Sequence, residues 1–330
     1  MNQNQKPYEV VRYFALALDP IHVGTGGYRL GRVDMSIVRE PGTNLPKIPG
    51  TSLSGACRTY ATMENPEKWP QCAGQGRSDK EKGTEGHCGS PNCPICVTFG
   101  FSKGEKSSFQ GLAQFFDARL VFFPVHSLAG PVWVTCPSAL ADWGMTESEP
   151  ADGETRLAAG LKIDSKLNLG WLMLDVVGND FTLDGKIDGV PNDIKKRAVL
   201  VSNKLFSHIV NDNLEVRTSV SIDPATGAAA EGALYTYEAL PRGSILGFEV
   251  VISDPRFYCI NGKIPISGNK PCNKITNVQQ TEKNPPDGRQ QVKKTVETGL
   301  RLFEPLGVGG MGTRGMGRLR LLNLSTGGGK

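Results

Sequence analysis

The chain has little of what marks several large protein classes. Only 7% of its 330 residues are aromatic, only 4 are histidine, and the formal net charge is just +4. No apolar stretch approaches the length that crosses a bilayer, and Met1–Val10 lacks the basic start and apolar run of a signal peptide. We therefore expect a cytoplasmic protein with no membrane partner. A polyanionic ligand is allowed by this charge but would need local clusters of basic residues.

Glycine and proline, by contrast, are plentiful, with 40 and 22 copies. This composition predicts a compact centre decorated by many loops, and the length suffices for one large core. We predict one elaborated domain over residues 1–330. Because strands and helices alternate irregularly, an α+β fold with an antiparallel sheet is favoured over a doubly wound parallel fold.

Hydrophobic patterning predicts the main elements. Runs rich in β-branched and apolar residues predict strands at 9–18, 33–39, 110–134 and 244–252. Helices are expected from Thr51 or Ser52, either of which can cap a helix that continues to Met63, from Leu205, and over 293–303.

Three other segments are less regular. Residues 215–242 predict a long hairpin turning at PATGAAAEG. Residues 140–195 show no pattern beyond strands and loops of an insertion. Residues 255–292 are rich in Pro, Asn, Gln and Lys and predict a flexible surface insertion.

Four of the eight cysteines fall between Cys72 and Cys96, in a polar segment (65–100) that has no core of its own. Cys93 and Cys96 form a C-x-x-C knuckle, and Cys88 precedes it. This spacing predicts a closed, structural zinc site that folds the segment. Cys72 and His87 compete for the fourth position. Of the other cysteines, Cys57 and Cys136 are expected to be small buried hydrophobes, and no role is predicted for Cys259 and Cys272.

The C-terminal segment GVGGMGTRGMGR alternates glycines with two arginines. Glycines let a backbone approach a phosphate chain closely, and arginines supply forked charged donors to it. The segment is not a nucleotide P-loop, because no Gly-Lys-Ser/Thr closes it, and it leads to a strand rather than opening a helix as a dinucleotide fingerprint does. The alternative is a tight structural turn with solvated arginines.

The segment IPGTSLSGACR places Thr51, Ser52 and Ser54 at a predicted helix start, with Arg58 further along the helix. Free backbone N–H groups at such a start can receive phosphates. An ordinary capped helix is the alternative.

Six segments occur in a characteristic order: HVGTGG, GRVDMSIVRE, KIPGTSLSGACR, ARLVFFPVHSLAGPVWVT, EVRTSVSIDPATGAAAEGALYTYEALPRG and GVGGMGTRGMGR. In this order the chain resembles the RAMP backbone subunits of type III CRISPR complexes, particularly the Cmr-type branch. The C-x-x-C knuckle is more typical of the Csm-type branch, so the subtype stays open.

The resemblance implies a modified RRM-like, ferredoxin-like RAMP domain, copies of which stack along a guide RNA. Residues 215–242 would then be a thumb hairpin inserted between guide and target, with Ala228–Ala230 as an apolar wedge; an ordinary edge hairpin is the alternative. The implied partners are crRNA, target RNA and other effector subunits, including copies or relatives of this chain. The implied RNA-binding residues are His22, Arg32, Lys47, Thr51, Ser52, Ser54, Arg58, Arg217, Gly310, Gly312, Arg314, Gly315 and Arg318.

The resemblance also places a target-cleaving aspartate at Asp34. A carboxylate can bind Mg²⁺ or another divalent ion, or help activate an RNA 2′-hydroxyl that attacks the adjacent phosphate. His22 and Arg32 are candidate proton donor and phosphate clamp, against the alternatives of a solvated Asp34 and a packed His22. Two other functions compete with cleavage of target RNA: a noncatalytic scaffold of the same complex, and a stand-alone nuclease that processes precursor guide RNA, usually with a catalytic histidine.

Overall fold

The computed structural model describes residues 6–26, 33–74, 86–103, 107–183, 187–230, 233–272 and 288–324. The single domain predicted from the sequence divides into two compact units that interleave along the chain. Unit 1 comprises Met1–Tyr13, Gly50–Asp117 and Phe248–Phe303, and unit 2 comprises Phe14–Pro49, Ala118–Gly247 and Glu304–Lys330. Helices and strands occur in both units, which confirms the predicted α+β class.

The strands of unit 2 belong to a large sheet with order β15-β1-β14-β6-β7-β11-β8-β10-β9, and β2 also pairs with β6. The first part of β1, up to Tyr13, and the part of β14 from Phe248 are counted in unit 1. The β7–β11 and β8–β10 pairs are parallel and the others with a recorded register are antiparallel, so the sheet is mixed rather than purely antiparallel as predicted. The chain between β7 and β11, residues 136–197, crosses back so that β11 runs in the same direction as β7. Within this stretch β8 and β10 also run in the same direction. The strands are β1 (Tyr8–Ala17), β2 (Lys47–Ile48), β6 (Ala118–Val125), β7 (Val132–Thr135), β8 (Glu154–Ala158), β9 (Lys166–Leu169), β10 (Leu172–Phe181), β11 (Ala198–Leu200), β14 (Ile245–Ser253) and β15 (Leu319–Leu321).

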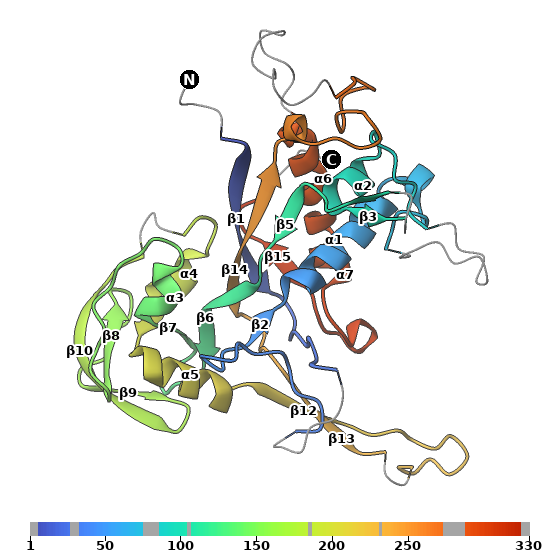
Figure 1. Cartoon of the computed structure of the whole chain (residues 1–330). Coiled ribbons are helices and arrows are strands. Elements are labelled where there is room, and N and C mark those ends of the chain that lie inside the picture. The colour runs from blue at the N-terminus through green and yellow to red at the C-terminus, as the bar shows by residue number, and fades with distance from the viewer. Residues whose placement is uncertain are drawn as a thin grey trace. The chain divides into compact units, whose positions relative to one another are not determined.

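Short helices and one long hairpin complete unit 2. The helices are α3 (Pro137–Ala141), α4 (Asn192–Lys196), α5 (Asn203–Asp212), α7 (Phe303–Leu306) and the 3₁₀ helix η4 (Gly312–Arg314). The hydroxyl of Ser202 caps α5 by accepting from the backbone N–H of Leu205 at 3.3 Å. After α5 the chain enters the hairpin β12 (Glu215–Ser219) and β13 (Tyr235–Ala239), as Figure 1 shows and the sequence predicted.

Aromatic side chains centre the core of unit 2. Phe14 meets Trp143 edge to face at 5.0 Å between ring centroids. Phe122, Phe181 and Ile245 are buried in the same cluster. The apolar runs of β1, β6 and β14 that predicted strands therefore supply this core.

The strand predicted at 33–39 is not a regular strand. Only isolated bridges form, among them Met35 to Tyr237 and Gly24 to Ile37. The reason lies in a side chain: the backbone N–H of Ile37 donates to Glu238 Oε1 at 2.9 Å, so this donor is not available to a neighbouring strand. The segment nevertheless runs along β13 through the Met35–Tyr237 bridge, and this positions Asp34.

Unit 1 packs two longer helices, α1 (Gly50–Met63) and α6 (Arg289–Arg301), near a small set of strands. The other elements are α2 (Pro94–Phe99), β3 (Phe101–Ser102), β4 (Ser108–Phe109), β5 (Ala113–Phe115), η1 (Pro66–Lys68) and η2 (Pro255–Phe257). The predicted cap of α1 was wrong in detail. Thr51 and Ser52 lie inside the helix, and the Asp117 carboxylate accepts from the Gly50 N–H at 2.8 Å instead.

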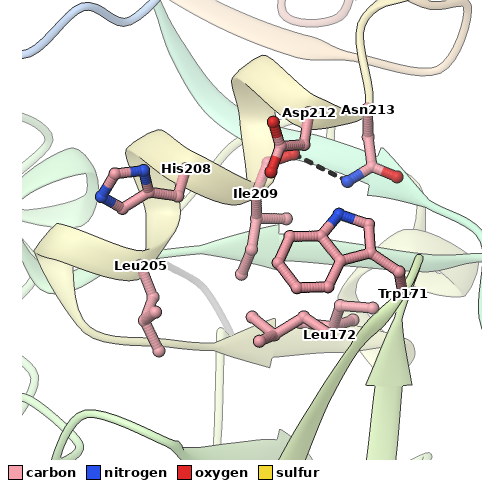
Figure 2. A pocket seen from close by; sticks show the side chains of 8 residues that line it. Trp171, Leu172, Leu205, His208, Ile209, Asp212 and Asn213 are labelled. Atoms are coloured by element: carbon pink, nitrogen blue, oxygen red, sulfur yellow. Dashed lines mark hydrogen bonds between the residues drawn. The ribbon is translucent and has the colours of Figure 1, made fainter.

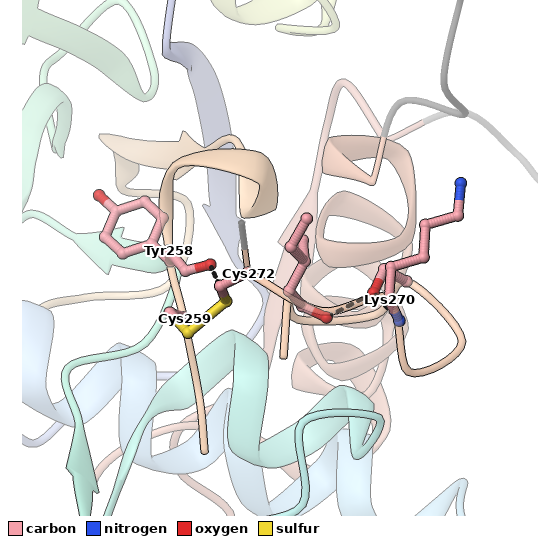
Figure 3. Close-up of a disulfide and its surroundings, with 6 residues drawn as sticks. Tyr258, Cys259, Lys270 and Cys272 are labelled. Atoms are coloured by element: carbon pink, nitrogen blue, oxygen red, sulfur yellow. Dashed lines mark hydrogen bonds between the residues drawn. A yellow bond between two sulfur atoms is a disulfide. The ribbon is translucent and has the colours of Figure 1, made fainter. Parts of the chain in front are cut away.

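A disulfide joins Cys259 and Cys272, the pair for which the sequence predicted no role (Figure 3). It closes a turn-rich segment within the predicted insertion 255–292, whose residues 273–287 lie outside the described part of the chain. Cys57 and Cys136 are buried free thiols, as predicted. Among the described residues, no helix has the length and hydropathy of a membrane span.

Two glycines make the α1–α6 packing testable. A Cβ on Gly299 of α6 would lie 2.2 Å from the backbone oxygen of Cys57 in α1, whereas a Cβ on Gly55 of α1 would meet nothing within 4 Å. We expect Gly299→Ala to destabilise the fold by about 1–3 kcal/mol through overpacking. Gly55→Ala should stabilise it by about 0.5–1 kcal/mol, because alanine loses less backbone entropy in a helix. Thermal unfolding of both variants checks this, and equal shifts in melting temperature would contradict the packing described.

Candidate nucleic-acid interface and metal centre

Asp34 is an exposed carboxylate fixed at the start of β13. Its Oδ2 accepts from the backbone N–H of Thr236 at 2.7 Å and from the Thr236 hydroxyl at 2.9 Å. The Thr236 backbone N–H and then its hydroxyl hold the pKa of Asp34 below its usual range. Asp34 is therefore an ionised, oriented group rather than a freely rotating surface aspartate.

The backbone beside Asp34 is anchored by a nearly buried ion pair. Met35 donates to the oxygen of Thr236 at 3.1 Å and accepts from Glu238 N–H at 3.2 Å. Glu238 is 7% exposed, and its two carboxylate oxygens accept from Arg39 at 2.6 and 2.8 Å. Removing one member would leave an unpaired charge in a low-dielectric setting. This pair holds the segment after Asp34 against the hairpin.

A groove of about 830 Å³ with a mixed polar and apolar lining opens beside the same segment. Its lining comes from the loop after Asp34, the end of α5 and the start of the hairpin. The lining residues are Thr25, Val33, Ser36, Ile37, Val38, Arg39, Glu40, Pro41, Asn44, Asn211, Asp212, Leu214, Val216 and Glu238.

His22 is packed rather than exposed. It is 5% exposed, its Nδ1–H donates to the backbone oxygen of Glu238 at 2.7 Å, and its ring meets Tyr237 edge-on. Its backbone oxygen accepts from Gly310 N–H at 2.8 Å. The structure thus places His22 beneath the glycine-rich loop, in agreement with the packed alternative. Arg32, its predicted companion, lies outside the described residues.

The glycines of the C-terminal loop differ in how much room surrounds them. A Cβ on Gly309 would lie 2.6 Å from the oxygen of His22, and one on Gly317 would lie 2.7 Å from the oxygen of Val308, so these two are required by close backbone packing. Gly312 and Gly315 have nothing within 4 Å of a Cβ. Gly310 has only ordinary contacts to His22. The open part of the loop is therefore its tip, where Gly312 and Gly315 flank Arg314.

Arg314 joins this tip to the hairpin. Its guanidinium lies over the Tyr235 ring, 5.5 Å from the centroid, and it hydrogen-bonds the Tyr235 hydroxyl. Met311 and Met316 pack with Tyr235 and Tyr237 in a small apolar cluster. Residues from three distant segments of the chain, namely Asp34, Thr236 with Tyr235, and Arg314, thus meet along β13.

Basic residues gather elsewhere in unit 2. Hydrogen bonding to Arg318, and then the charges of Arg318, Arg242 and Arg217, lower the pKa of Asp19. Arg217, Arg242 and Arg318, here called the arginine patch, therefore lie within electrostatic range of Asp19, while Arg217 also pairs with Glu215 at 2.6 Å. The exposed Arg242 was missed by sequence reasoning, although its place in LPRG directly after the hairpin was a usable signal. Lys47 in β2 lies opposite another cation, Arg119 of β6.

The hairpin beyond its paired strands exposes apolar side chains. Leu234 is 67% exposed and Ile222 is 56% exposed. The predicted wedge Ala228–Ala230 turns at the tip, where Ala228 accepts from Asp223 N–H at 2.8 Å. The larger exposed apolar groups are thus Leu234 and Ile222, and residues 231–232 lie outside the described chain.

In unit 1, the predicted phosphate-binding residues separate. Thr51 is exposed in the first turn of α1, with Ser52 and Ser54 partly buried nearby. Arg58 instead donates to the Cys72 oxygen at 2.7 Å, to the Gly100 oxygen at 2.8 Å and to His87 Nδ1 at 3.0 Å. The guanidinium of Arg58 is therefore directed into the cysteine segment, not toward a ligand of the helix start.

Four thiols converge in this segment. The sulfur atoms of Cys72, Cys88, Cys93 and Cys96 all lie within 4.8 Å of one another, and three of the separations are 3.6, 3.7 and 3.9 Å. A tetrahedral zinc ion with Zn–S bonds of about 2.3 Å requires sulfur separations of about 3.8 Å. Hydrogen bonds from Cys72, Cys93 and Cys96 lower the pKa of Cys88, which favours a thiolate. These residues fit a tetrahedral thiophilic metal.

His87, the competing ligand, points elsewhere. Its Nδ1 accepts from Arg58, and burial and then the Arg58 charge lower its pKa. His87 is therefore a neutral imidazole beside the cluster. The four cysteine sulfurs already supply the four ligands of a tetrahedral site.

A second hollow in unit 2, about 240 Å³ in volume, lies between α5 and the β9–β10 turn (Figure 2). Figure 2 shows Trp171 and Leu172 facing Leu205 and Ile209 across it. None of the residues predicted as sites lines this hollow, although it shares Asp212 with the groove beside the Asp34 segment.

Comparisons with known proteins bear on what these sites do. The sequence model of the RAMP superfamily matches residues 15–320. The chain is 25% identical over 260 residues, 72% of this chain and 80% of its relative, to the CRISPR system Cmr endoribonuclease Cmr4 of Pyrococcus furiosus.

Solved structures share the fold. A subunit of a Type III-B Cmr-beta complex bound to cognate target RNA matches with a TM-score of 0.62 and 15% identity, covering 96% of this chain and 99% of that one. Oligomeric Cmr4 from Pyrococcus furiosus matches with a TM-score of 0.56 and 18% identity, covering 96% and 100%.

Proposed function

The chain belongs to the RAMP superfamily, and on that premise we propose that it is a backbone subunit of a type III CRISPR RNA-guided complex. In this proposal it binds guide crRNA, assembles with copies or relatives of itself, and cleaves complementary target RNA in the cytoplasm. The likeness to a relative named as a Cmr endoribonuclease supports the assignment.

One observation carries the cleavage proposal: the exposed Asp34 carboxylate is fixed by Thr236, near the end of the β12–β13 pair that leads into the hairpin loop. A hairpin with exposed apolar groups such as Leu234 is suited to separate stacked bases. Nucleotides splayed in this way reach in-line geometry more readily than stacked ones. The carboxylate would therefore lie where the RNA backbone is most open to cleavage.

In the proposed reaction, ionised Asp34 accepts the proton of an RNA 2′-hydroxyl. The 2′-oxygen attacks the adjacent phosphorus, the bond from phosphorus to the 5′-oxygen breaks, and water protonates that oxygen. The products are a 2′,3′-cyclic phosphate and a 5′-hydroxyl end. Among the described residues, the cysteine cluster is the one group of three or more potential metal ligands, so Asp34 stands without a cage of carboxylates. A single carboxylate of this kind can hold a Mg²⁺ ion together with RNA phosphates, and the ion would neutralise the negative charge that develops on the phosphate.

For the cysteine cluster we propose a structural zinc ion bound by Cys72, Cys88, Cys93 and Cys96. Four sulfur ligands with separations near those of a tetrahedron support a closed site. Such an ion would fold the polar segment 65–100, which has few apolar residues with which to form a core.

The arginine patch provides a test of RNA binding. If Arg242 contacts phosphate, Arg242→Ala should weaken crRNA binding equally for all guide sequences and reduce the slope of log affinity against log salt by about 1. Lys166→Ala is the matched control, because Lys166 is an exposed cation of β9 paired with Asp175. Filter binding at several salt concentrations measures both. Sequence-dependent weakening, or the same loss with Lys166→Ala, would refute a phosphate contact.

A further inference from the structure

Arg58 reaches the cysteine segment from outside it. The residue lies on α1, yet its three hydrogen bonds go to the backbone of Cys72, the backbone of Gly100 and the ring of His87. Cys72 is a cluster member, Gly100 ends α2 directly after the knuckle, and His87 precedes Cys88. One planar guanidinium therefore fixes the three backbone segments that carry the four thiols.

Lys103 approaches from the other end of the segment. Its Nζ donates to the backbone oxygen of Cys88 at 2.8 Å. Its aliphatic stem lies against Gly89, where an added Cβ would come within 3.3 Å of the Lys103 side chain. Lys103 thus lays its apolar carbons along Gly89 and directs its charge to the backbone of Cys88, a member of the cluster.

Charge explains why two cations are needed. Four thiolates and one Zn²⁺ leave a net charge of about −2 on the centre. Cys72 and Cys96 are 0% exposed and Cys93 is 1% exposed, so this charge is largely removed from water. A buried net charge is costly unless it is paired and hydrogen-bonded. One arginine and one lysine supply the matching positive charge.

We propose that Arg58 and Lys103 together balance the charge of the metal centre and hold its ligand loops, so that Arg58 serves the metal rather than RNA. The inference rests on the proposed zinc site. It accounts for an arginine at this position, because lysine cannot donate to three separated acceptors from a planar fork.

The test compares zinc retention in Arg58→Met, Arg58→Lys and Lys103→Met with that of the wild type. Purified full-length proteins are titrated with a chromogenic chelator, and zinc per chain is measured before and after. We expect Arg58→Met to lower zinc affinity by about 10–100-fold, as loss of groups that orient metal ligands does. Arg58→Lys should fall between Arg58→Met and wild type, because it keeps the charge and loses the fork.

Arg12→Met is the matched control, since Arg12 is an exposed arginine of unit 1 that pairs with Glu249 on another face. Unchanged zinc affinity in both Arg58→Met and Lys103→Met would overturn the inference while leaving the zinc site intact. A wild-type protein that holds no zinc would overturn both, and this result is read directly from metal content. Should Arg58→Met fail to fold, the zinc affinity of Lys103→Met decides the question. A loss of affinity supports the inference, and an unchanged affinity overturns it.

Cobalt substitution adds an independent readout. His87→Gln should leave the absorption spectrum of the cobalt-loaded protein that of four thiolate ligands. A wild-type spectrum of three thiolates and one nitrogen that is lost in His87→Gln would place His87 on the metal and contradict its assignment as a partner of Arg58.

Discussion

Asp34→Asn is expected to lower target-RNA cleavage by the guide-loaded complex at least about 100-fold, the loss typical for removal of a proton-transfer group. Asparagine has nearly the same shape and can still interact with Thr236, but it carries no charge and accepts no proton. Target binding should be unchanged, because the substitution leaves in place the arginines proposed to contact phosphate. The measurement is the rate of appearance of cut target RNA, with a parallel measurement of target affinity.

Asp164→Asn is the control for this substitution, because Asp164 is an exposed aspartate of unit 2 outside the hairpin region. Cleavage that persists in Asp34→Asn at the wild-type rate would leave the chain a noncatalytic scaffold and move the nuclease to another subunit. Cleavage by the purified chain without guide or partners would instead favour a stand-alone processing nuclease.

The pH dependence of cleavage follows from the Thr236 hydrogen bonds. They lower the pKa of Asp34, so the ionised form persists below the usual titration range of aspartate and is lost only as the pH falls through the lowered pKa. The acid limb of the rate profile should therefore lie below that range. Thr236→Val removes the hydroxyl but keeps the backbone N–H, and it should move this limb to higher pH.

Removing the metal is expected to have the largest effect on stability. Structural zinc sites contribute apparent binding free energies of about 10–16 kcal/mol in isolated zinc-finger peptides, which are unfolded without metal. A chelator strong enough to strip the cluster should therefore unfold segment 65–100 and lower the melting temperature of the protein sharply. Differential scanning calorimetry with and without chelator, together with zinc analysis, measures this directly.

Cys93→Ser should reproduce the effect of the chelator, because the hydroxyl of serine is a poor zinc ligand. Cys136→Ser serves as control, since Cys136 is a buried free thiol of unit 2 outside the cluster. A wild-type melting temperature that does not change when the chelator is added would exclude a structural metal.

Local signals in the sequence predicted much of the fold and part of the candidate sites. The C-x-x-C knuckle and Cys88 are close in sequence, so their spacing alone indicates a metal site. The hairpin around PATGAAAEG and a helix from Leu205 were likewise predicted from short segments, although the Ser202 cap of α5 was not.

Other features depend on residues far apart in the chain, and no local pattern shows them. Thr236 lies 202 residues from Asp34, and the cap of α1 comes from Asp117, 67 residues beyond Gly50. Arg58 follows a phosphate-binding pattern in sequence, yet the fold turns its guanidinium toward Cys72. The pairing of Cys259 with Cys272 likewise depends on how their loop closes.

The central claim is that the chain works as an RNA-guided subunit, and the most direct measurement is sequencing of the RNA that copurifies with it from cells. The account predicts guide RNAs of defined length, each with a repeat-derived end joined to a spacer, protected along a stretch that contacts this chain. Recovery of no RNA, or of cellular transcripts without repeat-derived ends, would contradict it.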